Sequence, residues 1–217
     1  MSTAFPGPPL SLSAGLDLGR VVPIVTIERA QDAPHVVTAL VAGGLPVIEI
    51  TLRTAAGLDA LRGSHGLGAV VGAGTVTTPD EAAQVIDAGA QFAVSPGIDV
   101  DMVTTLLAAG VPVFPGIATP SELMVARALG LRTVKVFPVG TLGGAAFVRA
   151  LSGVWPDMRF MPTGGVTEAT MRDYLAIPAV TAVGGSWMVP AGLIEDRNWS
   201  GITQIARRAA DLAEDSK

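Results

Sequence analysis

One lysine lies where its amine could do chemistry. Only two of the 14 basic residues are lysines, Lys135 and Lys217. Lys135 lies in the apolar run 133–137, which is typical of a strand buried on both faces, and period-two alternation puts Thr133, Lys135 and Phe137 on one face. Because burial disfavours the ammonium, the pKa of such a lysine falls and its neutral amine becomes a nucleophile toward carbonyl carbon. The alternative is a structural lysine on an edge strand, with its ammonium in water.

A glutamate stands in a similar position in a second apolar run. Of the 19 acidic residues, Glu49 alone lies inside a strong strand pattern, Val47–Leu52, where alternation places Glu49, Thr51 and Arg53 on one face. A buried carboxyl group can act as a general acid and base, and an arginine beside it can bind a substrate carboxylate through paired hydrogen bonds. The alternative is a structural ion pair between Glu49 and Arg53.

Glycine pairs follow two further strand patterns. Gly164-Gly165 comes directly after Thr163, and Gly184-Gly185 is followed by Ser186. In barrel enzymes the loops after the seventh and eighth strands bind phosphate through bare backbone N–H groups, and glycine permits the close approach that this requires. The two pairs therefore predict a phosphate site, whereas an isolated pair would be explained by a turn.

Other common chemistries lack their residues. The sequence has no cysteine, which excludes disulfides, zinc thiolates and thiol nucleophiles. His35 falls on a predicted helix and His65 in a predicted loop, so a histidine-ligated metal site or a Ser-His-Asp triad has no obvious components. The chemistry would have to depend on the lysine.

Short β-branched runs bounded by glycine or proline predict eight strands, which start 20 to 26 residues apart. They are Val21–Thr26, Val47–Leu52, Ala69–Gly74, Phe92–Ser95, Pro112–Pro115, Thr133–Phe137, Arg159–Thr163 and Thr181–Gly184. Such a spacing leaves room for one helix in each connection, as parallel strands require. Thr-x-x-Glu capping boxes predict helices that begin at Thr78 and Thr119 and end at Gly89 and Gly130.

This alternation predicts an α/β protein with a (β/α)₈ TIM barrel as a single domain over residues 19–217. We expect residues 1–18 to form a tail or a short helix over the barrel bottom. An open doubly wound sheet is the alternative, but no G-x-G-x-x-G pattern follows the first strand.

The composition excludes several classes of partner. The net charge is −5, the pI is about 4.9 and no long basic run is present, which argues against binding to nucleic acid. The long uncharged stretches Met102–Ser121 and Tyr174–Ile194 contain prolines, so neither is typical of a membrane span. No signal-peptide pattern is visible, and we expect a cytoplasmic protein.

Seven segments occur in an order that is typical of one family. They are Val21-Val22-Pro23-Ile24, Glu49-Ile50-Thr51-Leu52-Arg53-Thr54, Val71-Gly72-Ala73-Gly74-Thr75-Val76, Val94-Ser95-Pro96-Gly97, Lys135-Val136-Phe137-Pro138, Pro162-Thr163-Gly164-Gly165-Val166 and Gly184-Gly185-Ser186-Trp187. Together they closely resemble the 2-keto-3-deoxy-6-phosphogluconate (KDPG) aldolase family, which includes 4-hydroxy-2-oxoglutarate (KHG) aldolases. The resemblance implies a class I aldolase of the Entner–Doudoroff pathway, usually a homotrimer, that releases pyruvate and glyceraldehyde 3-phosphate.

The resemblance also implies a role for each matching residue. Lys135 would form the Schiff base, and Glu49 would move protons. Arg53 and Thr75 would bind the pyruvate carboxylate. The remaining matches would line the pocket at Pro96, Phe137 and Thr163 and receive the phosphate at Gly164, Gly165, Gly184, Gly185 and Ser186. No metal or other cofactor would be needed, because the protonated imine is the electron sink.

One departure from the family pattern and two alternative functions remain. Some relatives have arginine where this sequence has Thr26, whereas Arg53 favours a gluconate-type over a galactonate-type substrate. One alternative function is a phosphosugar isomerase or epimerase in which Glu49 is the base and Lys135 only stabilises an enolate. The other is a non-catalytic trimeric scaffold, which would not need to retain two buried charges.

Overall fold

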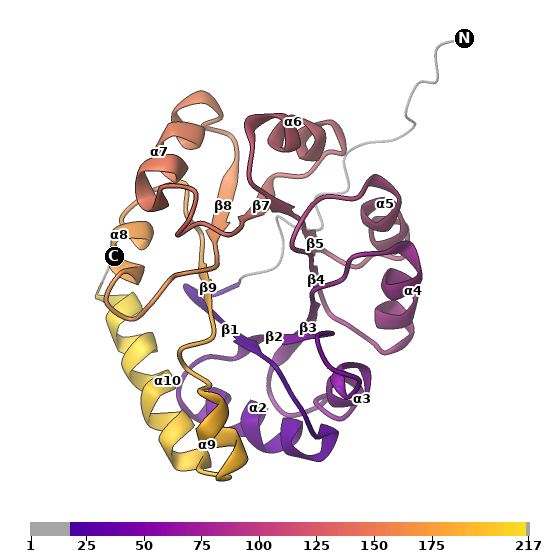
Figure 1. Ribbon diagram of the computed structural model, residues 1–217, viewed down its shortest axis with the longest axis vertical. Coiled ribbons are helices and arrows are strands. Elements are labelled where there is room, and N and C mark those ends of the chain that lie inside the picture. The colour runs from indigo at the N-terminus through magenta and orange to yellow at the C-terminus, as the bar shows by residue number, and fades with distance from the viewer. Residues whose placement is uncertain (1–17, 216–217) are drawn as a thin grey trace.

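The computed structural model describes residues 18–215, so the predicted N-terminal tail or helix lies outside the described residues except for Leu18. It is an α/β fold in which every strand pairing is parallel and the helices surround the strands (Figure 1). The strands are β1 (Val21–Val25), β2 (Val47–Thr51), β3 (Val70–Gly74), β4 (Ala93–Val94), β5 (Val113–Phe114), β6 (Gly116–Ile117), β7 (Thr133–Val136), β8 (Arg159–Pro162) and β9 (Val183–Gly185).

The strands form two sheets, with the orders β5-β4-β3-β2-β1-β9 and β6-β7-β8. Neighbours in the sheets follow the chain order, and the last strand, β9, pairs with the first. A doubly wound sheet reverses its order after the first strand, so that alternative does not fit. The predicted strand Pro112–Pro115 contains β5, which pairs with β4. The short strand β6 begins just after Pro115, which lacks an N–H donor, and pairs with β7; the sequence analysis did not predict it.

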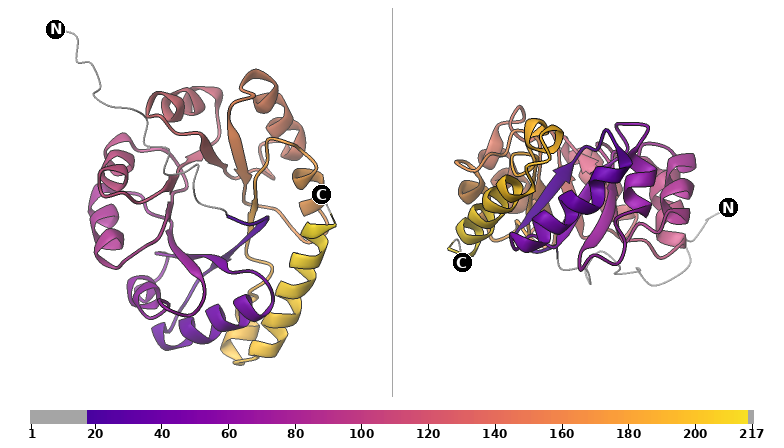
Figure 2. Two further views of the ribbon diagram at one scale, coloured as in Figure 1. Left: turned by 180° about the vertical axis from the view of Figure 1, so that it is seen from behind. Right: turned by 90° about the horizontal axis from the view of Figure 1, so that it is seen from below.

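Helices lie between successive predicted strands, as the spacing predicts. They are η1 (Ala30–Asp32), α2 (Ala33–Ala42), α3 (Gly57–Arg62), α4 (Pro79–Asp87), α5 (Val100–Ala108), α6 (Pro120–Ala128), α7 (Gly144–Val154), α8 (Met171–Leu175), α9 (Ala191–Glu195) and α10 (Trp199–Glu214). The two helices that the capping boxes predict are α4 and α6. No capping box in the sequence marks the short helices α3 and α9. In the views of Figure 2 the helices again lie outside the strands, with α10 beside α2.

The two predicted capping boxes differ in detail. At α6 both arms form, because the Thr119 side chain accepts from the Glu122 backbone N–H and the Glu122 carboxylate accepts in return. At α4 the Thr78 hydroxyl caps as predicted, but the Glu81 carboxylate binds Thr77 instead, so this box is only half formed.

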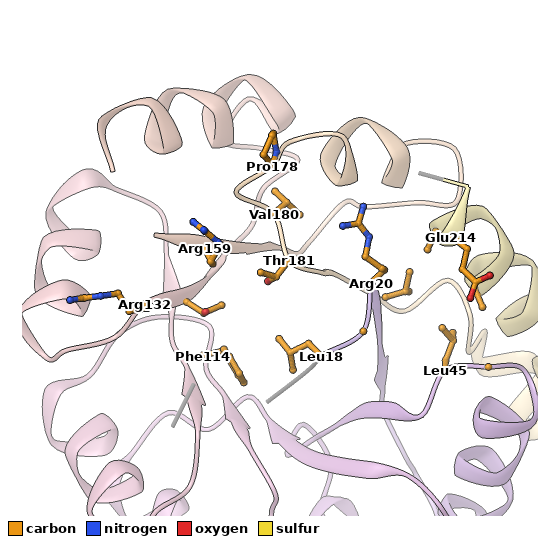
Figure 3. Close-up of a pocket in the computed structure, with 16 residues that line it drawn as sticks. Leu18, Arg20, Leu45, Phe114, Arg132, Arg159, Pro178, Val180, Thr181 and Glu214 are labelled. Carbon is orange, nitrogen blue, oxygen red and sulfur yellow. The ribbon is translucent and has the colours of Figure 1, made fainter. Parts of the chain in front are cut away.

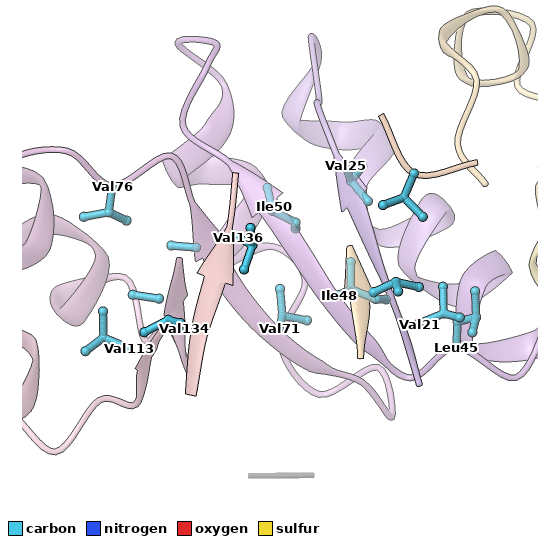
Figure 4. Close-up of a cluster of buried hydrophobic side chains, with 14 of the residues drawn as sticks. Val21, Val25, Leu45, Ile48, Ile50, Val71, Val76, Val113, Val134 and Val136 are labelled. Carbon is cyan, nitrogen blue, oxygen red and sulfur yellow. The ribbon is translucent and has the colours of Figure 1, made fainter. Parts of the chain in front are cut away.

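Apolar side chains are divided between the two faces of the strands. One cluster joins the strands to the helices and includes Val134 and Val136 (Figure 4). The second cluster contains no helix residue and consists of Leu18, Val22, Val47, Phe92, Val94, Phe114, Met161 and Ala182. Because side chains alternate along a strand, Lys135 and Glu49 point to this second, inner face.

Among the described residues, no helix combines the length and apolar character that a membrane span needs.

Candidate active site

The two predicted reactive residues meet on the inner face. Lys135 on β7 and Glu49 on β2 are 3% and 0% exposed, and the Lys135 Nζ atom lies 3.8 Å from Glu49 Oε1. A lysine this deeply buried cannot extend its ammonium into water, so the edge-strand alternative is wrong. No ion pair among the described residues joins Glu49 to Arg53, so that alternative is not supported either. The sequence placed each residue on an inward face, and the fold brings the two side chains together.

The environment of the pair favours the uncharged form of both groups. Burial raises the pKa of Glu49, an effect that Lys135 and then Arg53 partly oppose. Burial also lowers the pKa of Lys135, where Glu49 opposes the shift and Arg53 adds to it. The 3.8 Å separation is too long for a hydrogen bond, and neither carboxyl oxygen of Glu49 has a hydrogen-bond partner within residues 18–215. The Lys135 amine, with its pKa lowered, thus lies beside a carboxyl group that can give or take a proton.

Arg53 and Thr75 follow the two neighbouring strands. Arg53 comes two residues after β2, is solvent-exposed, and lies close enough for its charge to act on both buried groups. Thr75 directly follows β3 with a φ of 62°, in the left-handed region that a β-branched residue rarely adopts. Such backbone strain, of order 1–3 kcal/mol, persists mainly at functional sites.

The predicted lining residues do not all meet at the lysine. The Phe137 ring centroid lies 5.1 Å from Lys135 Nζ, close enough for a cation–π contact when the amine is charged. Thr163, which is 2% exposed, donates its hydroxyl to the Met161 carbonyl. Pro96 instead lines a separate cavity of about 210 Å³ beside α5, and no described contact links it to Lys135 or Glu49.

The predicted phosphate loops lie beside each other. A parallel bridge pairs Thr163 with Gly184, so the loop after β8 runs next to the end of β9. Gly164 and Gly165 have φ values of 84° and 88°, which explains why both are glycine. Gly184 and Gly185 end β9, and the exposed Ser186 follows them.

A cavity of about 820 Å³ lies elsewhere, at the amino ends of the strands (Figure 3). Its lining includes the first residues of β1, β7 and β8, which are Val21, Thr133 and Arg159. Neither Lys135 nor Glu49 lines it. Because parallel α/β folds bind ligands at the carboxyl ends of their strands, we place the chemistry at the Lys135–Glu49 pair.

The sequence analysis gave Gly74 no role in the site. The structure places it as the last residue of β3, packed against the Glu49 carboxyl group. A glycine inside a strand pattern often marks a close approach, and this is the signal that could have singled it out.

The fold is a parallel α/β fold, and its inner face holds a buried lysine amine beside a carboxyl group. The model of the KDPG and KHG aldolase family matches residues 12–205. The 2-dehydro-3-deoxy-phosphogluconate aldolase of Dickeya dadantii is 44% identical over 196 residues, covering 89% of this chain and 92% of the relative. The chain belongs to the KDPG and KHG aldolase family, as the resemblance predicted.

Solved structures support the same assignment. KDPG aldolase from Legionella pneumophila, with pyruvate captured at low pH as a covalent carbinolamine intermediate, is 39% identical with a TM-score of 0.85, covering 88% of this chain and 94% of that one. The 2-keto-3-deoxy-6-phosphogluconate aldolase of Zymomonas mobilis ZM4, solved with 3-phosphoglycerate, is 38% identical with a TM-score of 0.87, covering 94% and 96%. These relatives are aldolases, so the isomerase alternative has no support.

Proposed function

We propose that the protein is a class I aldolase that cleaves KDPG to pyruvate and glyceraldehyde 3-phosphate in the Entner–Doudoroff pathway, and that it also cleaves KHG to pyruvate and glyoxylate. Family membership supports the reaction class. The observation that carries the residue assignment is the buried Lys135 amine, 3.8 Å from the Glu49 carboxyl group.

The reaction begins with imine formation. The neutral Lys135 amine adds to the C2 carbonyl carbon to give a carbinolamine. The carbinolamine takes a proton from the Glu49 carboxyl group and loses water, which leaves a protonated imine and a Glu49 carboxylate. The Glu49 carboxylate then takes the proton of the C4 hydroxyl, the C3–C4 bond breaks, and its electron pair moves into the imine to form an enamine. Glyceraldehyde 3-phosphate leaves.

The enzyme is restored in two further steps. The enamine takes a proton at C3, with Glu49 as the acid, and water hydrolyses the resulting pyruvyl imine. The water consumed here balances the water released earlier. The protonated imine accepts the electron pair, so the proposal includes no metal and no other cofactor.

The remaining residues bind the substrate. Arg53 and the strained Thr75 hold the carboxylate next to the imine carbon, and their positions after β2 and β3 support this role. Pro96, Phe137 and Thr163 line the pocket. The backbone N–H groups of the two glycine-containing loops bind the phosphate. These loops contain Gly164, Gly165, Gly184, Gly185 and Ser186.

We further propose that the two sheets form one closed (β/α)₈ barrel in a single domain over residues 19–217. The pairing of β1 with β9, the Thr163–Gly184 bridge and the continuity of β5 and β6 through Pro115 support closure. A homotrimer is the proposed assembly, in line with the exposed large apolar side chains Val100, Met124, Val125 and Val154.

Reduction of the pyruvate imine tests the proposal directly. The protein is incubated with pyruvate and borohydride, its intact mass is measured, and the modified peptide is mapped. We expect one reduced pyruvyl adduct per chain, on Lys135. The only other lysine, Lys217, provides an internal control. A folded protein that gains no adduct, or gains it at Lys217, would contradict the mechanism.

A further inference from the structure

We propose that Gly74 is a positioning residue for Glu49, because its missing side chain leaves the space in which the Glu49 carboxyl group lies. A Cβ atom added at position 74 would lie 2.5 Å from Glu49 Cγ and 2.6 Å from Cδ, and closer still to Oε1. Real Cβ atoms do not approach heavy atoms so closely, so any side chain at position 74 would displace the carboxyl group. This inference rests on the proposed function, which gives Glu49 its catalytic role.

The backbone does not explain why residue 74 is glycine. Gly74 pairs in register with Thr51 on β2 and Val94 on β4, as an ordinary strand residue does. Its φ does not lie in the left-handed region, in contrast to Gly164 and Gly165. Steric room for Glu49 is therefore the reason that remains.

Packing is also what holds the carboxyl group in place. Neither Glu49 oxygen has a hydrogen-bond partner among the described residues, and the Lys135 amine is 3.8 Å away. No hydrogen bond would hold the group against a shift of its neighbours. A methyl group at position 74 would thus change the distance between the carboxyl group and the imine that Lys135 forms, while the flexible end of Glu49 could move and let the protein fold.

A double-mutant cycle between Gly74→Ala and Glu49→Ala tests this. In the otherwise unchanged protein, Gly74→Ala should lower kcat for KDPG cleavage tenfold or more, change KM less than threefold, and lower Tm. In the Glu49→Ala background the overlapping atoms are gone, so Gly74→Ala should lower neither the residual kcat nor Tm. Equal effects in both backgrounds, or no effect in either, would overturn the proposal.

Gly72→Ala is the matched control. Gly72 lies two residues earlier on the same face of β3, but its added Cβ would meet the Phe92 ring at 2.5 Å instead of Glu49. Its loss of Tm should be the same with and without Glu49. The pH midpoint of pyruvate trapping should shift in Gly74→Ala and not in Gly72→Ala, because only the former moves a titrating group beside Lys135.

The double-mutant cycle measured by Tm keeps this test separate from the proposed function. It needs no turnover, so it decides the role of Gly74 even if Glu49→Ala is too slow to assay. A parent protein that neither cleaves KDPG nor traps pyruvate would refute the aldolase assignment. Coupling of Tm between positions 74 and 49 in that same protein would still support the packing of Glu49 by Gly74.

Discussion

The two ends of the parallel strands hold buried polar atoms in very different settings. Toward the carboxyl ends, Lys135 and Glu49 are enclosed side by side with no room for bulk water. At the amino ends of the same strands, a cavity of about 820 Å³ opens past the exposed Arg132 and Arg159. Buried oxygens without hydrogen-bond partners occur at both ends, on Glu49 and on Thr181. The comparison teaches that the cavity of about 820 Å³ and the enclosed pair of titrating groups point to different ends of the strands, and the proposed function rests on the pair.

The enclosed pair reduces stability near neutral pH. Burial places the folded-state pKa of Lys135 below its ordinary value of 10.5, so the stability present above that value is lost as the pH falls through the folded-state pKa. Burial places the pKa of Glu49 above 4.5, so the stability present below that value is lost as the pH rises through the folded-state pKa. Between these limits the fold retains two groups that lower its stability and that the proposed function requires.

The largest effect is expected from Lys135→Arg, which keeps a cation on the inner face but cannot form an imine. Cleavage of KDPG should fall by about a thousandfold or more, and pyruvate trapping should disappear. Thr133→Ser, at the amino end of the same strand, is the control and should remain active. Retention of more than a few per cent of activity by Lys135→Arg would remove the nucleophile from the mechanism.

Glu49→Gln should have the next largest effect. Loss of the proton-transfer group should lower kcat by about 10²–10⁴-fold with little change in KM. Lys135 should still be trapped by pyruvate, as mass measurement can verify. A kcat within threefold of the parent value would show that another group moves the proton.

Arg53→Ala should mainly weaken substrate binding. A charge-assisted hydrogen bond contributes about 1.5–3 kcal/mol, so KM should rise by about 10-fold to 100-fold, with a smaller change in kcat. Steady-state kinetics with KDPG measure both constants. An unchanged KM would exclude Arg53 from the carboxylate site.

The pH dependence of trapping should report the buried amine. Imine formation needs the neutral amine, so the trapping rate should increase with pH and reach half of its maximum below pH 10.5, because burial lowers the pKa of Lys135. Pyruvate adducts are quantified by mass after short incubations in a buffer series. A midpoint at or above 10.5 would contradict a desolvated lysine.

The smallest effect is expected at the amino ends, from Thr181→Val. The Thr181 hydroxyl oxygen is buried without a hydrogen-bond partner among residues 18–215, so replacing it with a methyl group removes an unsatisfied polar atom. Activity should stay unchanged and Tm should stay the same or rise slightly. Thr163→Val, which removes a satisfied hydroxyl on the inner face, should lower both. A fall in activity for Thr181→Val would show that the two ends are coupled.

The strands and helices could be predicted from the sequence where a local residue pattern determines the secondary structure. Charged residues inside β-branched runs marked Lys135 and Glu49, and both lie within observed strands. Helices α3 and α9 are only six and five residues long, and Ala56 and Pro190, which precede them, make no side-chain capping bond that a sequence pattern could reveal. The segments before and after Pro115 pair with different strands, β4 and β7. The sequence alone does not specify these pairing partners.

The sequence pattern predicted which residues belong to the candidate site, but it did not predict which of them lie in contact. Alternation placed Glu49 and Lys135 on inward faces. With 85 residues between them in the sequence, no local pattern predicts the 3.8 Å contact that the fold creates. Pro96 follows a strand as predicted, yet it lines a separate cavity. A glycine inside a strand pattern indicates a close approach at Gly74. The sequence does not show that the approaching group is the Glu49 side chain, because this depends on the three-dimensional direction of that side chain.

The pairing of β1 with β9 bears on how the enzyme matures during synthesis. Val21 pairs with Val183, so one edge of β1 stays unpaired until most of the chain has left the ribosome. Gly184 and Gly185, the proposed phosphate contacts, are carried by this same late strand. An incomplete chain that ends before β9 would therefore already contain Lys135 and Glu49 but would lack half of its phosphate loops. The order in which the chain is made thus delays productive sugar-phosphate binding until the last strand is in place.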